Sequence, residues 1–149
     1  MVKVQRVLKS FIHYIGYDLH RLGTKFNPAF QLNKALNRFK VDLVFDVGAN
    51  VGQFASELRF YGYKGNILSF EPLSNAYSEL LRASDGDSGW DVYPRCALGD
   101  HNGGAEINIA GNSESSSLLA MLDIHLSVAP HTAYVDRESV PLRTLDSVA

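Results

Sequence analysis

Apolar residues follow a helical spacing at the start of the chain and form short runs further on. Between residues 3 and 22 they recur three and four positions apart, which predicts an amphipathic helix that Gly23 ends. A second helix is predicted over residues 29–39, after the pair Asn27-Pro28. Together these two helices predict a helical N-terminal extension over residues 1–40.

Residues 41–149 are predicted to form one α/β domain. Three apolar runs are typical of strands and two segments between them have helical spacing: 41–46, 67–71 and 90–93 for the strands, and 53–61 and 74–82 for the helices. This alternating order predicts a right-handed parallel α/β sheet. The first run is rich in β-branched and aromatic residues, so we expect a buried, central strand there.

The spacing within the two helices predicts which side chains face the sheet. They are Phe54, Ala55, Leu58 and Tyr61 in the first helix and Tyr77, Leu80 and Leu81 in the second. Gly62 is expected to end the first helix, and Ser74 to cap the second. Polar loops are expected over residues 83–89 and 111–117.

The pattern changes after the third strand. Asn102-Gly103 lies between the apolar segments 96–99 and 105–110, which predicts a β-hairpin. A short helix is predicted over residues 118–126 and a further strand over residues 139–145.

A glycine loop follows the first predicted strand and carries the candidate chemistry. Asp46 ends the strand, and Gly48 and Gly52 lie four positions apart where the next helix begins. In a doubly wound sheet, ligands bind just beyond the carboxyl ends of the strands. Glycine lets the backbone approach a ligand closely, and exposed amides at the helix start favour an anionic group. The loop therefore predicts a nucleotide-like ligand.

The second part of the signal is Glu71, which ends the next predicted strand 19 residues after Gly52. A carboxylate at this place can accept hydrogen bonds from both ribose hydroxyls. A pyrophosphate would be repelled by Asp46, whereas S-adenosylmethionine (SAM) carries an amino group and a sulfonium that an acid attracts. The pair therefore favours SAM over NAD, although both carboxylates could simply cap helices.

These motifs resemble the FkbM-type methyltransferase family. The resemblance rests on Asp46–Phe54, on Ser69-Phe70-Glu71-Pro72, on residues 96–100 and on Thr144-Leu145-Asp146. It implies the class I SAM-dependent methyltransferase fold, a Rossmann-like, doubly wound and mostly parallel α/β sheet, here with the N-terminal helices and the hairpin as additions. It also implies O-methylation of a sugar or natural-product hydroxyl.

The resemblance assigns cofactor roles to individual positions. Asp46, Gly48, Ala49, Asn50 and Gly52 are expected at the methionine end, and Glu71 at the ribose with Phe70 and Pro72 beside it. Ala97 and Leu98 are expected to border the adenine. No catalytic base can be assigned.

In this family a strand resembling Lys-Ile-Asp-x-Glu-Gly follows Thr-Leu-Asp and pairs with the first strand. This sequence stops at Ala149, so we expect an incomplete N-terminal portion of the domain with an open sheet edge. A competing hypothesis is therefore a non-catalytic nucleoside-binding or partner module that another chain completes, with self-association through that edge.

Charge is distributed unevenly along the chain and limits its partners. Residues 1–40 hold eight Lys and Arg against Asp18, a balance of +7, and the remainder has −9. We therefore expect no nucleic-acid binding by the body of the protein. The basic helix over residues 3–22 could lie on a membrane surface, but packing on the domain is favoured.

The remaining polar residues are interpreted as structural. The histidines at 13, 20, 101, 125 and 131 show no metal-binding spacing, so no metal site is predicted, and a base at His125 or His131 is less favoured than solvation. The hydroxyls of residues 113–117 could meet a polyol acceptor, but an ordinary loop is favoured. Cys96 is interpreted as a packing residue. A single cysteine, and the lack of a signal peptide, predict a cytoplasmic protein.

Overall fold

The computed structural model describes residues 27–110, 116–117 and 134–148. The predicted helices over residues 3–22 and 118–126 lie outside the described residues. The described elements are α2 (Pro28–Arg38), β1 (Leu43–Val47), α3 (Gln53–Phe60), β2 (Asn66–Phe70), α4 (Ser74–Ser84), β3 (Trp90–Val92), β4 (Ala97–Leu98), β5 (Gly103–Ala110), β6 (Tyr134–Arg143) and the 3₁₀ turn Leu145–Ser147.

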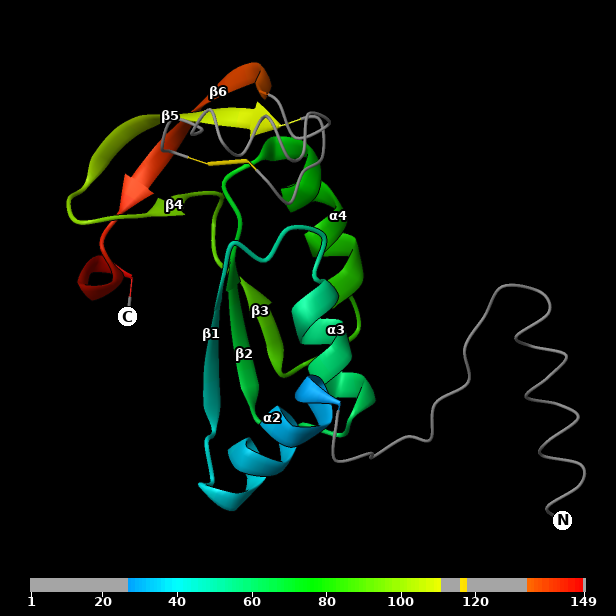
Figure 1. Cartoon of the computed structure of the whole chain (residues 1–149). Coiled ribbons are helices and arrows are strands. Elements are labelled where there is room, and N and C mark those ends of the chain that lie inside the picture. Colours follow the sequence, from blue (N-terminus) through cyan, green and yellow to red (C-terminus); the bar gives the residue numbers. More distant parts are fainter. Residues whose placement is uncertain (1–26, 111–115, 118–133, 149) are drawn as a thin grey trace, which may run out of the picture.

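The first sheet has the predicted parallel α/β arrangement. Its strands are ordered β1-β2-β3, both pairs are parallel, and Asp46 lies in register with Ser69. Helices α3 and α4 lie on the same side of this sheet (Figure 1). Ala55, Leu58 and Leu80 from these helices pack in one buried cluster with Ile67 and Trp90 of the strands. Local hydrophobic spacing was therefore sufficient to predict this part of the fold.

Strand β1 differs from the prediction of a buried, central strand. Among the described strands it forms the edge of the sheet, and Leu43, Phe45 and Val47 are 42%, 38% and 59% exposed. These three alternate positions point to the face opposite α3 and α4, because successive side chains of a strand point to opposite faces. The described residues therefore include the open edge that the sequence predicted, and its apolar face is exposed as well.

Helix α3 begins and ends at glycines. Gly52 is its N-cap residue with φ +89°, and Gly62 has φ +90° just beyond its last turn. The Tyr63 amide donates to the carbonyl of Leu58 and the Gly62 amide to that of Arg59, the pattern of a Schellman motif. Gly62 thus ends the helix as predicted, whereas Phe54 is 39% exposed and not one of its buried residues.

Two details of α4 were predicted wrongly. Leu73 is the N-cap residue and no side chain caps the helix there, so Ser74 is its first residue rather than its cap. Leu81 is 45% exposed, while Ala76 and Leu80 are the buried residues of the helix. The backbone amides of Leu73 and Ser74 instead donate to the Glu71 and Glu138 carboxylates, which removes the need for a serine cap.

The second sheet has a topology that the sequence did not predict. Its strand order is β4-β6-β5, in which β6 pairs with β4 in parallel and with β5 in antiparallel orientation. The predicted hairpin between residues 96–99 and 105–110 is therefore wrong, because β6 lies between these strands. A pattern around Asn102-Gly103 shows only a local change of direction and carries no information on a strand about 30 residues further on.

Helix α2 begins as predicted and packs on α3. The Asn27 side chain accepts from the Phe30 amide at 2.9 Å, with Pro28 at the first helical position. Asn27 also donates to the Tyr61 hydroxyl at 2.8 Å, and the Phe30 and Tyr61 rings meet edge to face. The pair Asn27-Pro28 is thus a helix start.

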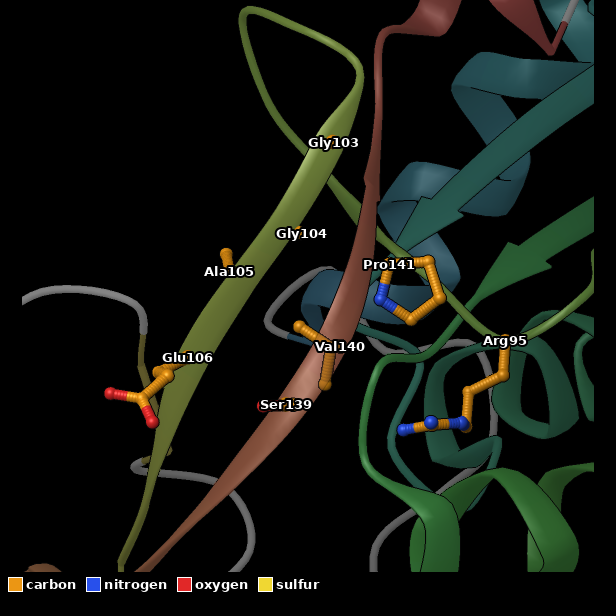
Figure 2. Close-up of a pocket in the computed structure, with 8 residues that line it drawn as sticks. All are labelled: Arg95, Gly103, Gly104, Ala105, Glu106, Ser139, Val140 and Pro141. Carbon is orange, nitrogen blue, oxygen red and sulfur yellow. The ribbon is translucent and has the colours of Figure 1, made fainter.

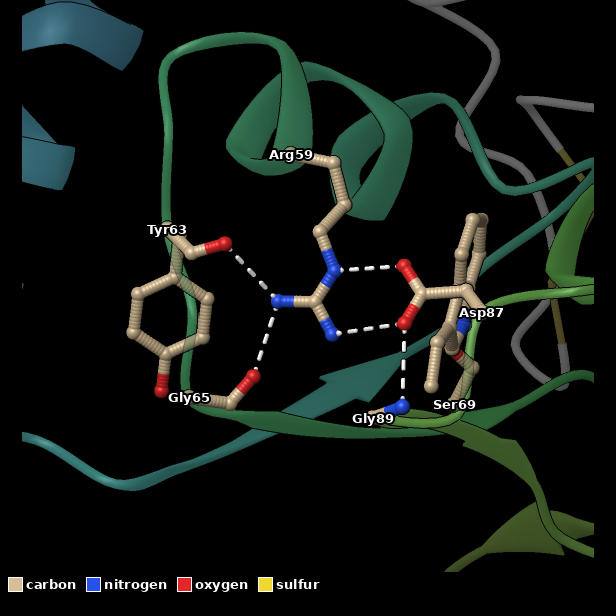
Figure 3. A network of polar contacts seen from close by, with 7 residues as sticks. Arg59, Tyr63, Gly65, Ser69, Asp87 and Gly89 are labelled. Atoms are coloured by element: carbon tan, nitrogen blue, oxygen red, sulfur yellow. Dashed lines mark hydrogen bonds and ion pairs between the residues drawn. The ribbon is translucent and has the colours of Figure 1, made fainter.

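An arginine at the end of α3 ties together the loops that lead into β2 and β3 (Figure 3). Arg59 makes two hydrogen bonds to the Asp87 carboxylate, at 2.7 and 3.3 Å, and donates to the carbonyls of Tyr63 and Gly65. Asp87 also accepts from the Gly89 amide at 3.0 Å. This network fixes the end of the sheet opposite the glycine loop.

Candidate functional site

The loop after β1 has a backbone that only some residues adopt easily. Gly48, Asn50 and Gly52 have φ values of +75°, +50° and +89°. Left-handed backbone favours glycine and, among other residues, asparagine. The residue types of the motif thus follow from the turn that joins β1 to α3.

The amides of this loop are turned toward β2. Gly48 and Ala49 both donate to the Phe70 carbonyl at 3.0 Å, and the Asn50 amide donates to the Glu71 carboxylate at 2.7 Å. The sequence predicted exposed amides at the helix start, and α3 begins at Gln53, after these three residues. In the part of the loop that precedes the helix, the end of β2 supplies the acceptors.

Glu71 is a buried carboxylate that holds two segments in place. It is 4% exposed, and its Oε2 accepts from Asn50 while its Oε1 accepts from the Leu73 amide at 2.9 Å. Burial raises the pKa of Glu71 above its usual range, the two amide bonds act against this, and the charges of Asp46 and Glu138 add to it. Glu71 therefore links the glycine loop to the start of α4.

Asp46 is buried on the helix-covered side of the sheet. It is 6% exposed, and its Oδ2 accepts from the Ser69 hydroxyl at 3.1 Å. Ser69 in turn accepts from the Trp90 indole N–H at 2.9 Å. Burial raises the pKa of Asp46, and the Ser69 hydrogen bond acts in the opposite direction. Sequence reasoning missed Ser69 and Trp90, although a lone serine inside the apolar run 67–70 was an available signal.

Gly52 is close to a side chain rather than to open space. A Cβ at this position would lie 2.9 Å from two ring atoms of Trp90 and 3.1 Å from Leu80. The glycine therefore allows close packing of the helix start on β3. At Gly48, by contrast, a Cβ would meet no atom within 4 Å.

A cavity of about 200 Å³ lies beside the loop, where the two sheets meet. Five of the ten predicted cofactor residues line it, and they come from three separate segments: Gly48; Phe70 and Pro72; Ala97 and Leu98. Its other lining residues are Val47, Cys96, Ile107, Ser116 and Ser117. The structure thus brings the β1 loop, the end of β2 and β4 together around one space.

The other five predicted residues do not line this cavity. Ala49 is 3% exposed and belongs to the core of the first sheet, and Gly52 packs on Trp90. Asp46, Asn50 and Glu71 lie behind the wall, where their hydrogen bonds shape the loop. The predicted set therefore divides into wall residues and residues that support the wall.

Cys96 is both a buried packing residue and part of the cavity lining. It is 2% exposed, as expected for a packing residue, but it also lines the cavity together with Phe70 and Ala97. Burial raises the pKa of its thiol, partly offset by the charge of Arg143.

A larger and more open hollow of about 650 Å³ lies along β5 and β6 (Figure 2). Gly103 and Gly104 of β5 line it on one side, and Arg95 lines it on the other (Figure 2). None of the predicted cofactor residues lines it. Size alone therefore does not select the candidate site.

Arg95 and Glu138 join the second sheet to the start of α4. Arg95 Nη1 lies 2.6 Å from Glu138 Oε1 and donates to the Pro72 carbonyl at 2.8 Å. Glu138 also accepts from the Ser74 amide at 3.2 Å. This contact, which the sequence did not predict, fixes the segment that carries Glu71 and Pro72 against β6.

The structure describes only some of the histidines and loop hydroxyls that the sequence analysis considered. His101 is exposed and lies 2.7 Å from the Asp100 carboxylate, whereas residues 13, 20, 125 and 131 lie outside the described residues. Of the hydroxyls at residues 113–117, Ser116 and Ser117 are described, and they line the cavity.

Within the described ranges no three His, Cys, Asp or Glu side chains gather as metal ligands. No helix in these same ranges is long and apolar enough to cross a membrane.

Comparison with known proteins identifies the family. The family model described as the methyltransferase FkbM domain matches residues 46–149, from the acid at the end of β1 onward. Neither the curated proteins nor the solved structures gave a match. The matched span includes the glycine loop, Glu71 and all the lining residues of the smaller cavity. The chain belongs to the FkbM methyltransferase family.

Proposed function

We propose that this protein is a SAM-dependent methyltransferase that acts on a hydroxyl of a sugar or related natural product. The observation that carries the proposal is the meeting of Gly48, Phe70-Pro72 and Ala97-Leu98 around one cavity in a chain of this family. The family match does not favour the competing hypothesis of a non-catalytic module. The proposal also includes the class I methyltransferase fold for residues 41–149, with residues 1–40 as an N-terminal helical extension.

The residues at the cavity fit a nucleoside with a cationic substituent. Gly48 leaves open space where any side chain would project, so the backbone can approach a ligand closely. Phe70, Pro72, Ala97 and Leu98 offer apolar contacts suited to an adenine ring. Because ligand pockets commonly measure about 300–1,000 Å³, this smaller space would enclose one part of such a cofactor.

Charge at the site favours a cation over a diphosphate. Asp46 and Glu71 are both buried at the loop, and in their ionised form the two carboxylates would favour a positively charged ligand. The amides of Gly48, Ala49 and Asn50 donate to Phe70 and Glu71, so these three are not available to an anionic group such as a pyrophosphate. Both observations support SAM and speak against NAD.

When bound, SAM supplies a methyl group on a sulfonium, which a nucleophilic oxygen can accept. The contribution of the described residues is to bind and orient. The loop and the apolar wall would fix the position of the cofactor, and alignment of two reactants is a large source of methyl-transfer acceleration. The buried carboxylates would favour the positive charge of the amino and sulfonium groups. We propose a small hydroxylated molecule or a glycan, rather than a nucleic acid, as the methyl acceptor.

Titration calorimetry of the unmodified chain tests the proposal. We expect saturable binding of SAM and of its demethylated product, with no heat from NAD under the same conditions. Transfer of a labelled methyl group to a panel of sugars and polyols then tests the acceptor class. Tight NAD binding without SAM binding would overturn the proposal.

A further inference from the structure

Three hydrogen-bonded polar groups, one from each strand of the first sheet, form a row next to the glycine loop (residues 46–52), which is the proposed cofactor loop. Asp46 of β1, Ser69 of β2 and Trp90 of β3 are 6%, 0% and 5% exposed. Asp46 and Ser69 are register partners, and Trp90 pairs with Ile67, which lies two positions before Ser69 and therefore on the same face of β2. The row therefore spans all three strands inside the packed layer between sheet and helices.

The direction of the hydrogen bonds in this row is fixed by chemistry. An indole N–H can only donate, so Trp90 Nε1 donates to Ser69 Oγ at 2.9 Å. Ser69 has one proton, which then points to Asp46 Oδ2 at 3.1 Å. The hydroxyl therefore acts as a donor that holds one carboxylate oxygen.

Trp90 also contacts the other end of the loop. Two atoms of its six-membered ring would lie 2.9 Å from a Cβ at Gly52. One side chain thus touches Gly52 directly and reaches Asp46 through Ser69. These two positions are the start and the end of the glycine loop, and Gly48 lies between them.

We propose that Ser69 and Trp90 are positioning residues for the cofactor loop, which set the orientation of the Asp46 carboxylate and the separation of the two loop ends. This inference rests on the proposed function, because it assigns the purpose of the row to SAM binding. Neither residue lines the cavity, so both act through Asp46 and the loop backbone.

The row also predicts how SAM binding depends on pH. Removing the Ser69 hydroxyl removes the interaction that lowers the pKa of Asp46, while burial continues to raise it. The charged neighbour that acts in the same region is Glu71, whose own pKa is raised in part by Asp46. If the ionised carboxylate favours SAM, affinity falls as pH decreases through this pKa, and without Ser69 the fall begins at a higher pH.

The first experiment measures SAM affinity against pH for Ser69→Ala and Trp90→Phe. Phenylalanine keeps a ring against Gly52 but loses the N–H. We expect about a tenfold weaker affinity for Ser69→Ala, as for one lost hydrogen bond to a charged group, with the pH midpoint shifted upward. Tyr63→Phe is the matched control, because it removes the hydroxyl of a buried tyrosine that donates to the Val41 carbonyl, just before β1 and away from the glycine loop. Equal behaviour of Ser69→Ala and Tyr63→Phe would overturn the inference and leave the proposed function intact.

The second experiment needs no cofactor. The chain has one tryptophan, so its fluorescence reports Trp90 alone. We expect the emission of the cofactor-free protein to titrate with the Asp46 carboxyl. Asp46→Asn should abolish the transition, Ser69→Ala should move or weaken it, and Tyr63→Phe should leave it unchanged. A transition that persists unaltered in Ser69→Ala contradicts the row even if the unmodified chain fails to bind SAM, which is the separate result that would overturn the proposed function.

Discussion

Glu71 accepts the backbone amide of Asn50 at 2.7 Å, and this contact joins the glycine loop of β1 to the end of β2. Its other oxygen accepts from Leu73 at the start of α4. The side chain that the sequence assigned to a ribose is therefore also a structural element of the glycine loop. Loss of this residue should affect folding and ligand binding together.

Replacement of Glu71 by alanine should destabilise the protein by about 1–3 kcal/mol, because two buried amides lose their acceptor. Glu71→Gln keeps one acceptor oxygen and should fall between alanine and the unmodified protein. Urea unfolding measures the difference, and calorimetry should show weaker SAM binding for both variants. Glu79→Ala, an exposed position on α4, is the control. A stable Glu71→Ala protein with unchanged SAM affinity would contradict this role.

The two glycines of the loop should respond differently to alanine. Gly48→Ala meets no neighbouring atom, so it should cost only about 1 kcal/mol of stability for its left-handed backbone, while its methyl group weakens SAM binding. Gly52→Ala places its Cβ 2.9 Å from the Trp90 ring, so it should lower the melting temperature much further. Thermal unfolding and SAM titration of the two variants separate the effects. Equal loss of stability in both would refute this division.

Arg59→Lys should destabilise the protein although the positive charge is kept. A single ammonium cannot make two bonds to Asp87 and also donate to the carbonyls of Tyr63 and Gly65 (Figure 3). We expect a loss of about 1–2 kcal/mol in urea unfolding. Arg82→Lys, on the exposed surface of α4, is the matched control and should change little. SAM affinity should be unaffected, because the network lies at the opposite end of the sheet.

Acid should affect the carboxylates in opposite directions. Arg59 holds the pKa of Asp87 below its ordinary value of 3.8, so the stabilisation it gives is present above that value and is lost as pH falls through the folded pKa. The pKa values of Asp46 and Glu71 are raised, so protonation of these two groups favours the folded state. The stability difference between the unmodified protein and Asp87→Asn should therefore be full near pH 7 and should shrink as the pH falls below 3.8. A difference that is constant over this range would contradict the assignment to the ion pair.

Local patterns predicted the first sheet because its elements follow one another along the chain. The runs ending at Asp46 and Glu71 became β1 and β2, and the glycines at 52 and 62 mark the two ends of α3. Pairing across long separations left no such pattern. For this reason the position of β6 between β4 and β5 was missed, as was the contact between Glu138 and Ser74.

The positions of the candidate residues followed from their motifs only in part. Gly48, Phe70, Ala97 and Leu98, which the resemblance assigned to one ligand, line one cavity, and their cofactor roles stay predictions. Gly52 was assigned to ligand approach, but the Trp90 ring occupies that space. The part played by Ser69 depends on the register of β1 and β2, which the sequence does not specify.

Because Cys96 lines the cavity, the rate at which its thiol is alkylated can report how often the cavity opens. It is the single cysteine of the chain, it is 2% exposed, and its raised pKa keeps the thiol protonated at neutral pH. An alkylating reagent can therefore react only when the residues that cover Cys96 move apart. The labelling rate, measured from the mass of the intact protein, reports how often such openings occur. Any molecule that fills the cavity should lower this rate.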